Sequence, residues 1–181
     1  MAGCNLDCAY CDTQYAKENY TELSIDEILA QIKKYNCSLV QITGGEPLIQ
    51  TESFKLIKKL CKKNYTVLVE TNGTISIKNL SKKVIPIIDI KCPSSKEHTK
   101  FNFDNIKYLK KHHEIKFVIS DLNDYIWAKN MLEKYKLYNK ALVLFSTVYG
   151  KISPKELGEL ILRDNLKVKL QLQLHKLLEL K

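Results

Sequence analysis

Arginine is nearly absent from this chain of 181 residues. Arg163 is the single one, although lysine and arginine together number 29 and the net charge is +9. Arginine is the side chain that reads phosphates and bases through paired hydrogen bonds. The positive charge comes instead from lysines, many of them in pairs such as Lys33-Lys34 and Lys110-Lys111. The composition therefore favours a solvated lysine-rich surface and argues against a nucleic-acid partner.

Long apolar runs are missing as well. No stretch approaches the roughly 18 apolar residues of a membrane helix, and no signal-peptide pattern is present. A hydrophobic content of 45% and a charged content of 27% are typical of a globular protein. We therefore expect one domain over residues 1–181, a cytoplasmic location and no membrane partner. The six cysteines are then interpreted as thiols and ligands in a reducing compartment.

Three of the cysteines, Cys4, Cys8 and Cys11, form a C-x3-C-x2-C run. Pairing among them would leave one thiol over, which argues against a disulfide framework. Three thiolates on one loop suit a cubane iron–sulfur cluster, and supplying three of its four ligands leaves one iron open for a small molecule. Zinc is the alternative, but it needs a fourth ligand, and no histidine lies near the run.

Strand and helix patterns alternate after this run. Ser24 and Glu27 form a capping box that predicts a helix from residue 25 to about 36. Further helices are expected over 52–63, 105–112 and 122–137, with another beginning at Pro154, and strands over 38–43, 65–71, 85–90, 114–120, 141–147 and 167–175. This order predicts an α/β fold with a parallel sheet covered by helices.

Polar clusters follow three of the expected strands: TGGEP at 43–47, ETNGT at 70–74 and DIKCPSS at 89–95. Each can be a simple turn, and Asp89 and Lys91 share a strand face and can merely pair. Together, at the same edge of one sheet, they favour a ligand site. On the last strand, Gln171, Gln173 and His175 either line an interior cavity or form the wet face of an edge strand.

The segment CNLDCAYCDT at 4–13 followed by TGGEP resembles the radical S-adenosylmethionine (SAM) superfamily. Within it, the CDT that starts at Cys11, together with ETNGT, DIKCPSS and the ending FSTVYGKISPKEL…LQLQLHK, is similar to the 7-carboxy-7-deazaguanine synthase (QueE) family. The resemblance runs over essentially the whole chain. It implies a partial (β/α)6 radical SAM barrel that here lacks its first strand.

The resemblance also implies a carbon–nitrogen lyase that converts 6-carboxy-5,6,7,8-tetrahydropterin to 7-carboxy-7-deazaguanine with loss of ammonia, for queuosine and other 7-deazapurines. Its cofactors would be a [4Fe-4S] cluster, SAM and Mg²⁺. A flavodoxin or ferredoxin would donate one electron, cleaving SAM to methionine and a 5′-deoxyadenosyl radical, and the enzyme would be a homodimer. No catalytic residue is assigned beyond the cofactor.

Carried over by motif position, the site residues fall into four sets. The cluster ligands would be Cys4, Cys8 and Cys11, the SAM contacts Tyr10, Cys11, Asp12, Gly45 and Ser94, the substrate contacts Thr43, Gln171 and His175, and the Mg²⁺ ligand Thr13. A hydroxyl among substrate oxygens and waters suits that hard cation.

The chain departs from the family in front of Cys4, where members carry a further strand with a Q-G-E segment and a substrate-binding arginine. The resemblance therefore implies that residues 1–181 are an incomplete form and that Met1 is an internal methionine. Arg163, in a distant expected helix, is no substitute for the missing arginine. Two alternatives remain: an activase-type radical SAM enzyme acting on a glycyl-radical protein, and a non-catalytic iron–sulfur or zinc-binding module.

Overall fold

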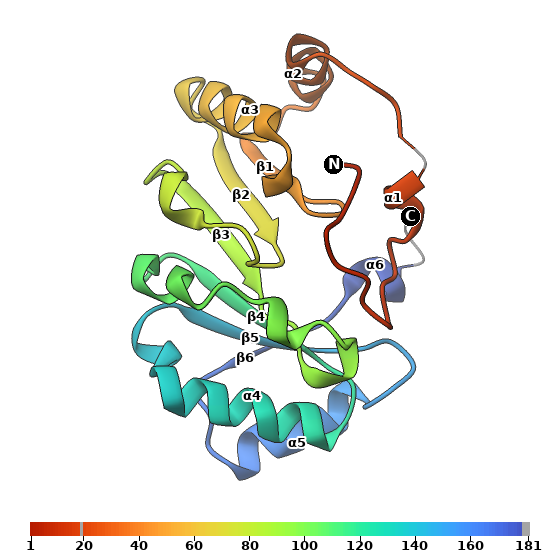
Figure 1. The fold of residues 1–181 in the computed structure, drawn as a ribbon, viewed down its shortest axis with the longest axis vertical. Helices are drawn as coiled ribbons and strands as arrows, with labels where there is room; N and C mark the ends of the chain where they lie inside the picture. The colour runs from red at the N-terminus through yellow and green to blue at the C-terminus, as the bar shows by residue number, and fades with distance from the viewer. Residues whose placement is uncertain (19, 179–181) are drawn as a thin grey trace.

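The computed structural model describes residues 1–18 and 20–178, apart from the side chains of residues 16, 18 and 175. In these residues six strands form one parallel sheet in the order β1-β2-β3-β4-β5-β6 (Figure 1). The strands are β1 Leu39–Ile42, β2 Thr66–Thr71, β3 Val84–Asp89, β4 Glu114–Ile119, β5 Leu142–Thr147 and β6 Lys169–Gln171. A strand lies within or close to each of the six predicted ranges, the last one much shorter than predicted, and the α/β architecture is confirmed.

Helices connect successive strands, which is what parallel pairing requires. The α-helices are α1 Tyr15–Glu18, α2 Ile25–Lys33, α3 Thr51–Lys62, α4 Leu122–Tyr135, α5 Pro154–Arg163 and α6 Leu174–Leu177. Short 3-10 helices are η1 Pro47–Ile49, η2 Ile77–Asn79, η3 Pro93–Ser95, η4 His98–Lys100, η5 Phe103–Tyr108 and η6 Leu137–Asn139. The predicted capping box is confirmed: Glu27 N–H donates to Ser24 Oγ, and Ser24 N–H to the Glu27 carboxylate. No described helix is long and apolar enough to cross a membrane.

The core lies between the sheet and its covering helices. Leu60 of α3, Val67 of β2, Phe117 of β4 and Phe145 of β5 are completely buried within one continuous hydrophobic cluster. Because this core supports the strands from their helix-covered side, their carboxyl ends are held in fixed positions.

Two expectations were wrong. The predicted strand over 167–175 pairs with β5 over Lys169–Gln171, and α6 begins at Leu174. β6 is an outer strand with a single neighbour, and its three residues are exposed, so no core fixes a longer extended segment. The helix predicted over 105–112 is the 3-10 helix η5, which begins after Asn102 and ends before Leu109.

The segment Met1–Thr13, here called the cysteine loop, crosses the carboxyl ends of the strands (Figure 1). Its first residues pair in parallel with the chain just after β1. The Met1 amine donates to Thr43 O over 2.7 Å, Gly45 N–H to Met1 O over 2.9 Å and Glu46 N–H to Gly3 O over 2.8 Å. The loop is thus docked at the β1 side of the sheet, and no strand precedes Cys4 in the described residues.

Candidate active site

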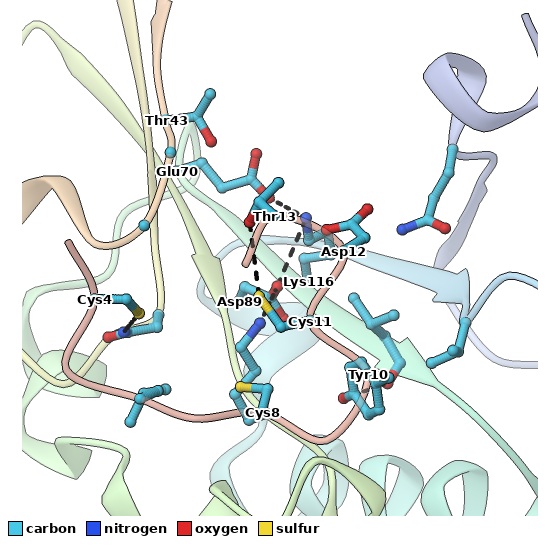
Figure 2. Close-up of a pocket in the computed structure, with 18 of the residues that line it drawn as sticks. Cys4, Cys8, Tyr10, Cys11, Asp12, Thr13, Thr43, Glu70, Asp89 and Lys116 are labelled. Atoms are coloured by element: carbon cyan, nitrogen blue, oxygen red, sulfur yellow. Dashed lines mark hydrogen bonds and ion pairs between the residues drawn. The ribbon is translucent and has the colours of Figure 1, made fainter. Parts of the chain in front are cut away.

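A cavity of about 770 Å³ lies between the cysteine loop and the carboxyl ends of the strands (Figure 2). Its walls include the loop itself and residues at or just after the ends of β1 to β5. This edge is where open parallel sheets bind their ligands, and it is the edge that the three polar clusters predict. TGGEP, ETNGT and DIKCPSS all contribute side chains or backbone to the lining.

The thiols of Cys4, Cys8 and Cys11 all line this cavity. Figure 2 shows them around its lower part, Cys4 apart from the other two. Burial raises the pKa of the Cys8 thiol to about 11. Among the described residues, no three histidine, cysteine or acidic side chains are grouped as ligands of one metal ion. In a cubane cluster the thiolates bind separate irons, so thiols spread along one cavity wall fit a cluster better than a single zinc.

The two glycines of TGGEP make the docking of the loop possible. A Cβ on Gly45 would lie 1.9 Å from Gly3 O, and one on Gly44 would lie 2.0 Å from Met1 O. Gly44 also has a φ of +131°, which L side chains rarely adopt. Any side chain at either position would therefore push the cysteine loop away from the sheet.

Glu46 of the same motif is a fully buried acid that joins η1 to the end of β2. Its carboxylate accepts hydrogen bonds from Leu48 N–H at 2.9 Å, Thr71 Oγ1 at 2.8 Å and Asn72 N–H at 2.6 Å. Burial raises the pKa of this carboxyl, although the three donors work in the opposite direction. Glu46 therefore fixes the end of β2 and the turn that follows, whose residues Thr71 and Asn72 line the cavity.

A chain of charges crosses the cavity wall. Lys116 of β4 makes an ion pair with Glu70 of β2 and lies 3.7 Å from Asp89 of β3 (Figure 2). Lys91 lies 2.8 Å from the same Asp89 carboxylate, so the predicted Asp89–Lys91 pairing is confirmed. Burial by itself would raise the pKa of Asp89, but Lys91 and Lys116 hold it below its usual value. Gln41 Nε2 donates to the other Glu70 oxygen over 3.0 Å.

Eight of the predicted site residues line the one cavity: Cys4, Cys8, Tyr10, Cys11, Asp12, Thr13, Thr43 and Gly45. The Tyr10 hydroxyl donates to Val118 O, and burial raises the pKa of this phenol. Thr13 Oγ1 lies 3.7 Å from Cys11 Sγ, and Asp12 faces Lys176 Nζ of α6 at 3.5 Å. The cysteine loop therefore presents its expected SAM and Mg²⁺ contacts to the same space as its thiols.

Two predicted residues, Ser94 and Gln171, do not line the cavity. Ser94 does not line it: its N–H donates to Asp124, and its hydroxyl lies 3.4 Å from Asp121. Gln171 is exposed at the outer strand, whereas its neighbour Gln173 does line the cavity. The prediction for the His175 side chain falls outside the described residues. Their assignments to SAM and substrate stay predictions.

Sequence reasoning missed Lys116 and assigned no role to Asn72. Lys116 stands between Ile115 and Phe117, which are both completely buried, so a charged residue inside an apolar strand was the available signal. Asn72 lies in the ETNGT turn, where an Asn-Gly pair is explained by turn formation alone. Its 3.9 Å contact with Cys4 Sγ depends on a partner 68 positions away in sequence.

Comparison with known proteins identifies the superfamily of enzymes to which a chain with this fold and this cavity belongs. The family model described as the Radical SAM superfamily matches residues 1–113, well over half of the chain. The chain therefore belongs to this superfamily of enzymes, and membership implies a [4Fe-4S] cluster and SAM as cofactors.

Curated relatives identify the family within this superfamily. The 7-carboxy-7-deazaguanine synthase of Chlorobaculum tepidum is 40% identical over 97% of this chain and 81% of the relative, and that of Koribacter versatilis is 39% identical over 97% and 84%. The chain belongs to the 7-carboxy-7-deazaguanine synthase family. In fold it is similar to QueE from Escherichia coli, with a TM-score of 0.75 and 20% identity over 95% of this chain and 82% of that one. It is also similar in fold to anSMEcpe with bound AdoMet, with a TM-score of 0.60 and 17% identity over 94% and 61%.

Proposed function

We propose that this chain converts 6-carboxy-5,6,7,8-tetrahydropterin to 7-carboxy-7-deazaguanine with loss of ammonia, as a carbon–nitrogen lyase of queuosine and 7-deazapurine biosynthesis. The observation that carries the proposal is the single cavity that unites the three thiols with the TGGEP turn, in a chain 40% identical to a 7-carboxy-7-deazaguanine synthase. The relatives named above give no support to the activase or to the non-catalytic module.

The residues of the cavity support specific roles. Cys4, Cys8 and Cys11 would hold the cluster, and Tyr10, Cys11, Asp12 and Gly45 would bind SAM beside it. When bound, the cluster and SAM supply one-electron chemistry, and the protein supplies binding and orientation. Thr43 at the end of β1 would contact the pterin. Ser94 for SAM, and Gln171 and His175 for the substrate, complete the proposed set on motif position alone.

The proposal extends to Mg²⁺ and to partners. Thr13 lines the cavity next to Cys11, and its hydroxyl would bind Mg²⁺ together with substrate oxygens and waters. A one-electron donor such as flavodoxin or ferredoxin would reduce the cluster. We further propose one radical SAM domain over residues 1–181, a homodimer and a cytoplasmic location, with a small-molecule substrate and neither nucleic acid nor membrane as a partner.

The test is turnover by the anaerobically reconstituted chain, joined to the strand with the Q-G-E segment and the arginine that the family resemblance expects before Cys4, with dithionite, SAM, Mg²⁺ and the tetrahydropterin. We expect mass spectrometry to detect 7-carboxy-7-deazaguanine while the amount of SAM stays constant. The matched control lacks all three thiols through Cys4→Ala, Cys8→Ala and Cys11→Ala. Cluster-loaded protein that cleaves SAM but leaves the pterin unchanged would support an activase, and zinc in place of iron in metal analysis would support the non-catalytic module.

A further inference from the structure

Asn72 lies directly after β2 and faces the cysteine loop. Its side-chain Nδ2 is 3.9 Å from Cys4 Sγ, a contact drawn as a dashed line at Cys4 in Figure 2. The same nitrogen is 3.0 Å from Asn5 Oδ1. An amide nitrogen carries two hydrogens, so Nδ2 can donate to both atoms at once. Asn72 is 8% exposed, so little water competes for these bonds.

The orientation of this amide is determined by its other partners. Asn72 Oδ1 accepts hydrogen bonds from Thr74 N–H at 3.0 Å and from Thr74 Oγ1 at 2.7 Å. Because the oxygen must face these donors, the nitrogen must face Cys4 and Asn5. Asn5 Nδ2 in turn donates to Thr74 Oγ1 over 2.8 Å, which closes a ring of three polar side chains.

The backbone beneath the ring is also held. Asn72 N–H donates to the buried carboxylate of Glu46 over 2.6 Å, so the TGGEP motif holds the residue that contacts Cys4. The amide therefore needs no rearrangement to donate to the sulfur. Fixed donors of this kind around a metal site orient the ligands and tune the metal.

We propose that Asn72 is a positioning residue for the iron–sulfur cluster: it donates an N–H···S hydrogen bond to the Cys4 thiolate and thereby raises the reduction potential of the cluster. The inference rests on the proposed function through its assignment of Cys4 as a cluster ligand. Reduction adds negative charge that spreads onto the ligating sulfurs, and a donor aimed at one of them stabilises the reduced state. Hydrogen bonds to sulfur are among the factors that set cluster potentials.

The experiment is a potentiometric titration of the anaerobically reconstituted full chain, followed by electron paramagnetic resonance, without SAM or pterin. Asn72→Asp keeps the shape of the side chain but removes both donors, and Asn72→Ala removes the whole amide. We expect both variants to keep the iron content of the unchanged protein and to show a more negative midpoint potential, with the larger shift in Asn72→Asp because of its added charge.

Thr74→Val is the matched control. It opens the polar ring and loosens the loop, but it leaves Asn72 Nδ2 beside Cys4, so its potential should stay near that of the unchanged protein. A potential in Asn72→Ala equal to that of the unchanged protein would overturn the proposal, and so would an equal shift in Thr74→Val. If Asn72→Ala loses its iron, the isosteric Asn72→Asp carries the test.

Failure of the inference and failure of the proposed function give different results. A protein with that upstream segment that binds a cluster and has a measurable potential, yet forms no product from the pterin, contradicts the function alone. Normal turnover in an Asn72→Ala variant whose potential is unshifted contradicts the inference alone. A chain that binds no iron contradicts both.

Discussion

At the scale of single residues, Lys116 is a largely buried charge in the cavity wall. Its ammonium contacts two carboxylates from neighbouring strands, and its side chain is 15% exposed. A buried ion pair adds little net stability when complete, but removing one partner leaves an uncompensated charge. Lys116 therefore keeps Glu70 and Asp89 compatible with a folded sheet.

The substitution Lys116→Met should destabilise the chain by roughly 3–5 kcal/mol, because it leaves the Glu70 carboxylate without a cation and Asp89 with Lys91 alone. Urea unfolding followed by circular dichroism measures this loss. Lys107→Met is the matched control: Lys107 makes an exposed ion pair with Asp104, and its removal should leave the free energy of unfolding nearly unchanged. Equal losses in the two variants would show that the Lys116 network is no more important than a surface pair.

Each thiol of the cysteine loop should be needed for the cluster. We expect Cys4→Ala, Cys8→Ala or Cys11→Ala to remove the roughly four irons and four sulfides of a cubane, because each thiolate binds a separate iron. Iron and sulfide analysis with the visible absorption spectrum measures this. Cys37→Ala and Cys61→Ala should keep the cluster, since neither residue lines the cavity. Cluster loss in Cys61→Ala alone would overturn the ligand assignment.

Thr13→Ala should change the response of turnover to Mg²⁺. If the hydroxyl is a ligand, the variant will need a higher Mg²⁺ concentration for half-maximal activity, while SAM binding, which depends on the cluster and its neighbours, will be retained. Steady-state rates across a Mg²⁺ series and a SAM-binding titration separate the two effects. The same Mg²⁺ dependence in both proteins would remove Thr13 from the metal site.

At the scale of elements, His113 at the start of β4 makes stability depend on pH. The side chain is 6% exposed and its Nδ1 has no partner among the described residues. Burial, with smaller contributions from His112 and Lys110, lowers the pKa of His113 from 6.5 to about 4. The unfolded chain therefore binds this proton more readily than the folded chain between these two values.

We expect the free energy of unfolding to fall as the pH drops from 6.5 towards 4, by up to about 3 kcal/mol from this group. His113→Phe, which cannot be protonated, should lack this part of the decrease. Denaturant unfolding at several pH values measures both proteins, and the difference between them removes the shared effect of the carboxylates. Parallel pH profiles would show that His113 does not titrate in this way.

Most elements could be predicted because their causes are local. The capping box at Ser24, the Pro154 helix start and the β-branched runs determine structure within a few residues. The failure at 167–175 has a non-local cause: β6 is an exposed outer strand whose pairing ends at Gln171, opposite Ser146, although β5 continues to Thr147. An alternating pattern cannot reveal that a strand lies at the edge of the sheet without a core to extend it.

In the candidate site, too, residues with local causes could be predicted and residues with non-local causes could not. Motif spacing predicted eight residues that line one cavity, because the loop and the TGGEP turn are each continuous in sequence. The roles of Lys116 and Asn72 could not be predicted, because each depends on partners from other elements. Glu70 lies 46 positions from Lys116, and Cys4 lies 68 positions from Asn72.

At the scale of the whole molecule, the sheet and its core are built without the cysteine loop. The three largest completely buried side chains, Tyr125, Phe117 and Phe145, belong to α4, β4 and β5. The loop is attached through backbone hydrogen bonds, such as Ala9 N–H to Ser95 O at 3.0 Å, and through side-chain bonds, such as Asn5 Nδ2 to Thr74 Oγ1 at 2.8 Å. A cluster bound to the folded loop would add stability that the unfolded chain does not gain.

Removing iron with a chelator should therefore lower the unfolding temperature while leaving the secondary structure nearly unchanged. Circular dichroism measures both quantities, and limited trypsin digestion should cut the iron-free chain faster near Lys17, beside the loop. The control is chelator added to the variant that lacks all three thiols, whose unfolding temperature should not move. Loss of helical signal on iron removal would show that the core depends on the cluster.

The docking of the cysteine loop also determines the order in which the site can be assembled. The loop precedes all of these partners in the sequence: Thr43 to Glu46, then Thr74, then Ser95 and Glu97. Contacts between residues so far apart in sequence form more slowly than local contacts. We therefore expect the three thiols to stay reduced and unpaired until β3 has formed, and insertion of the cluster to be a late step of maturation.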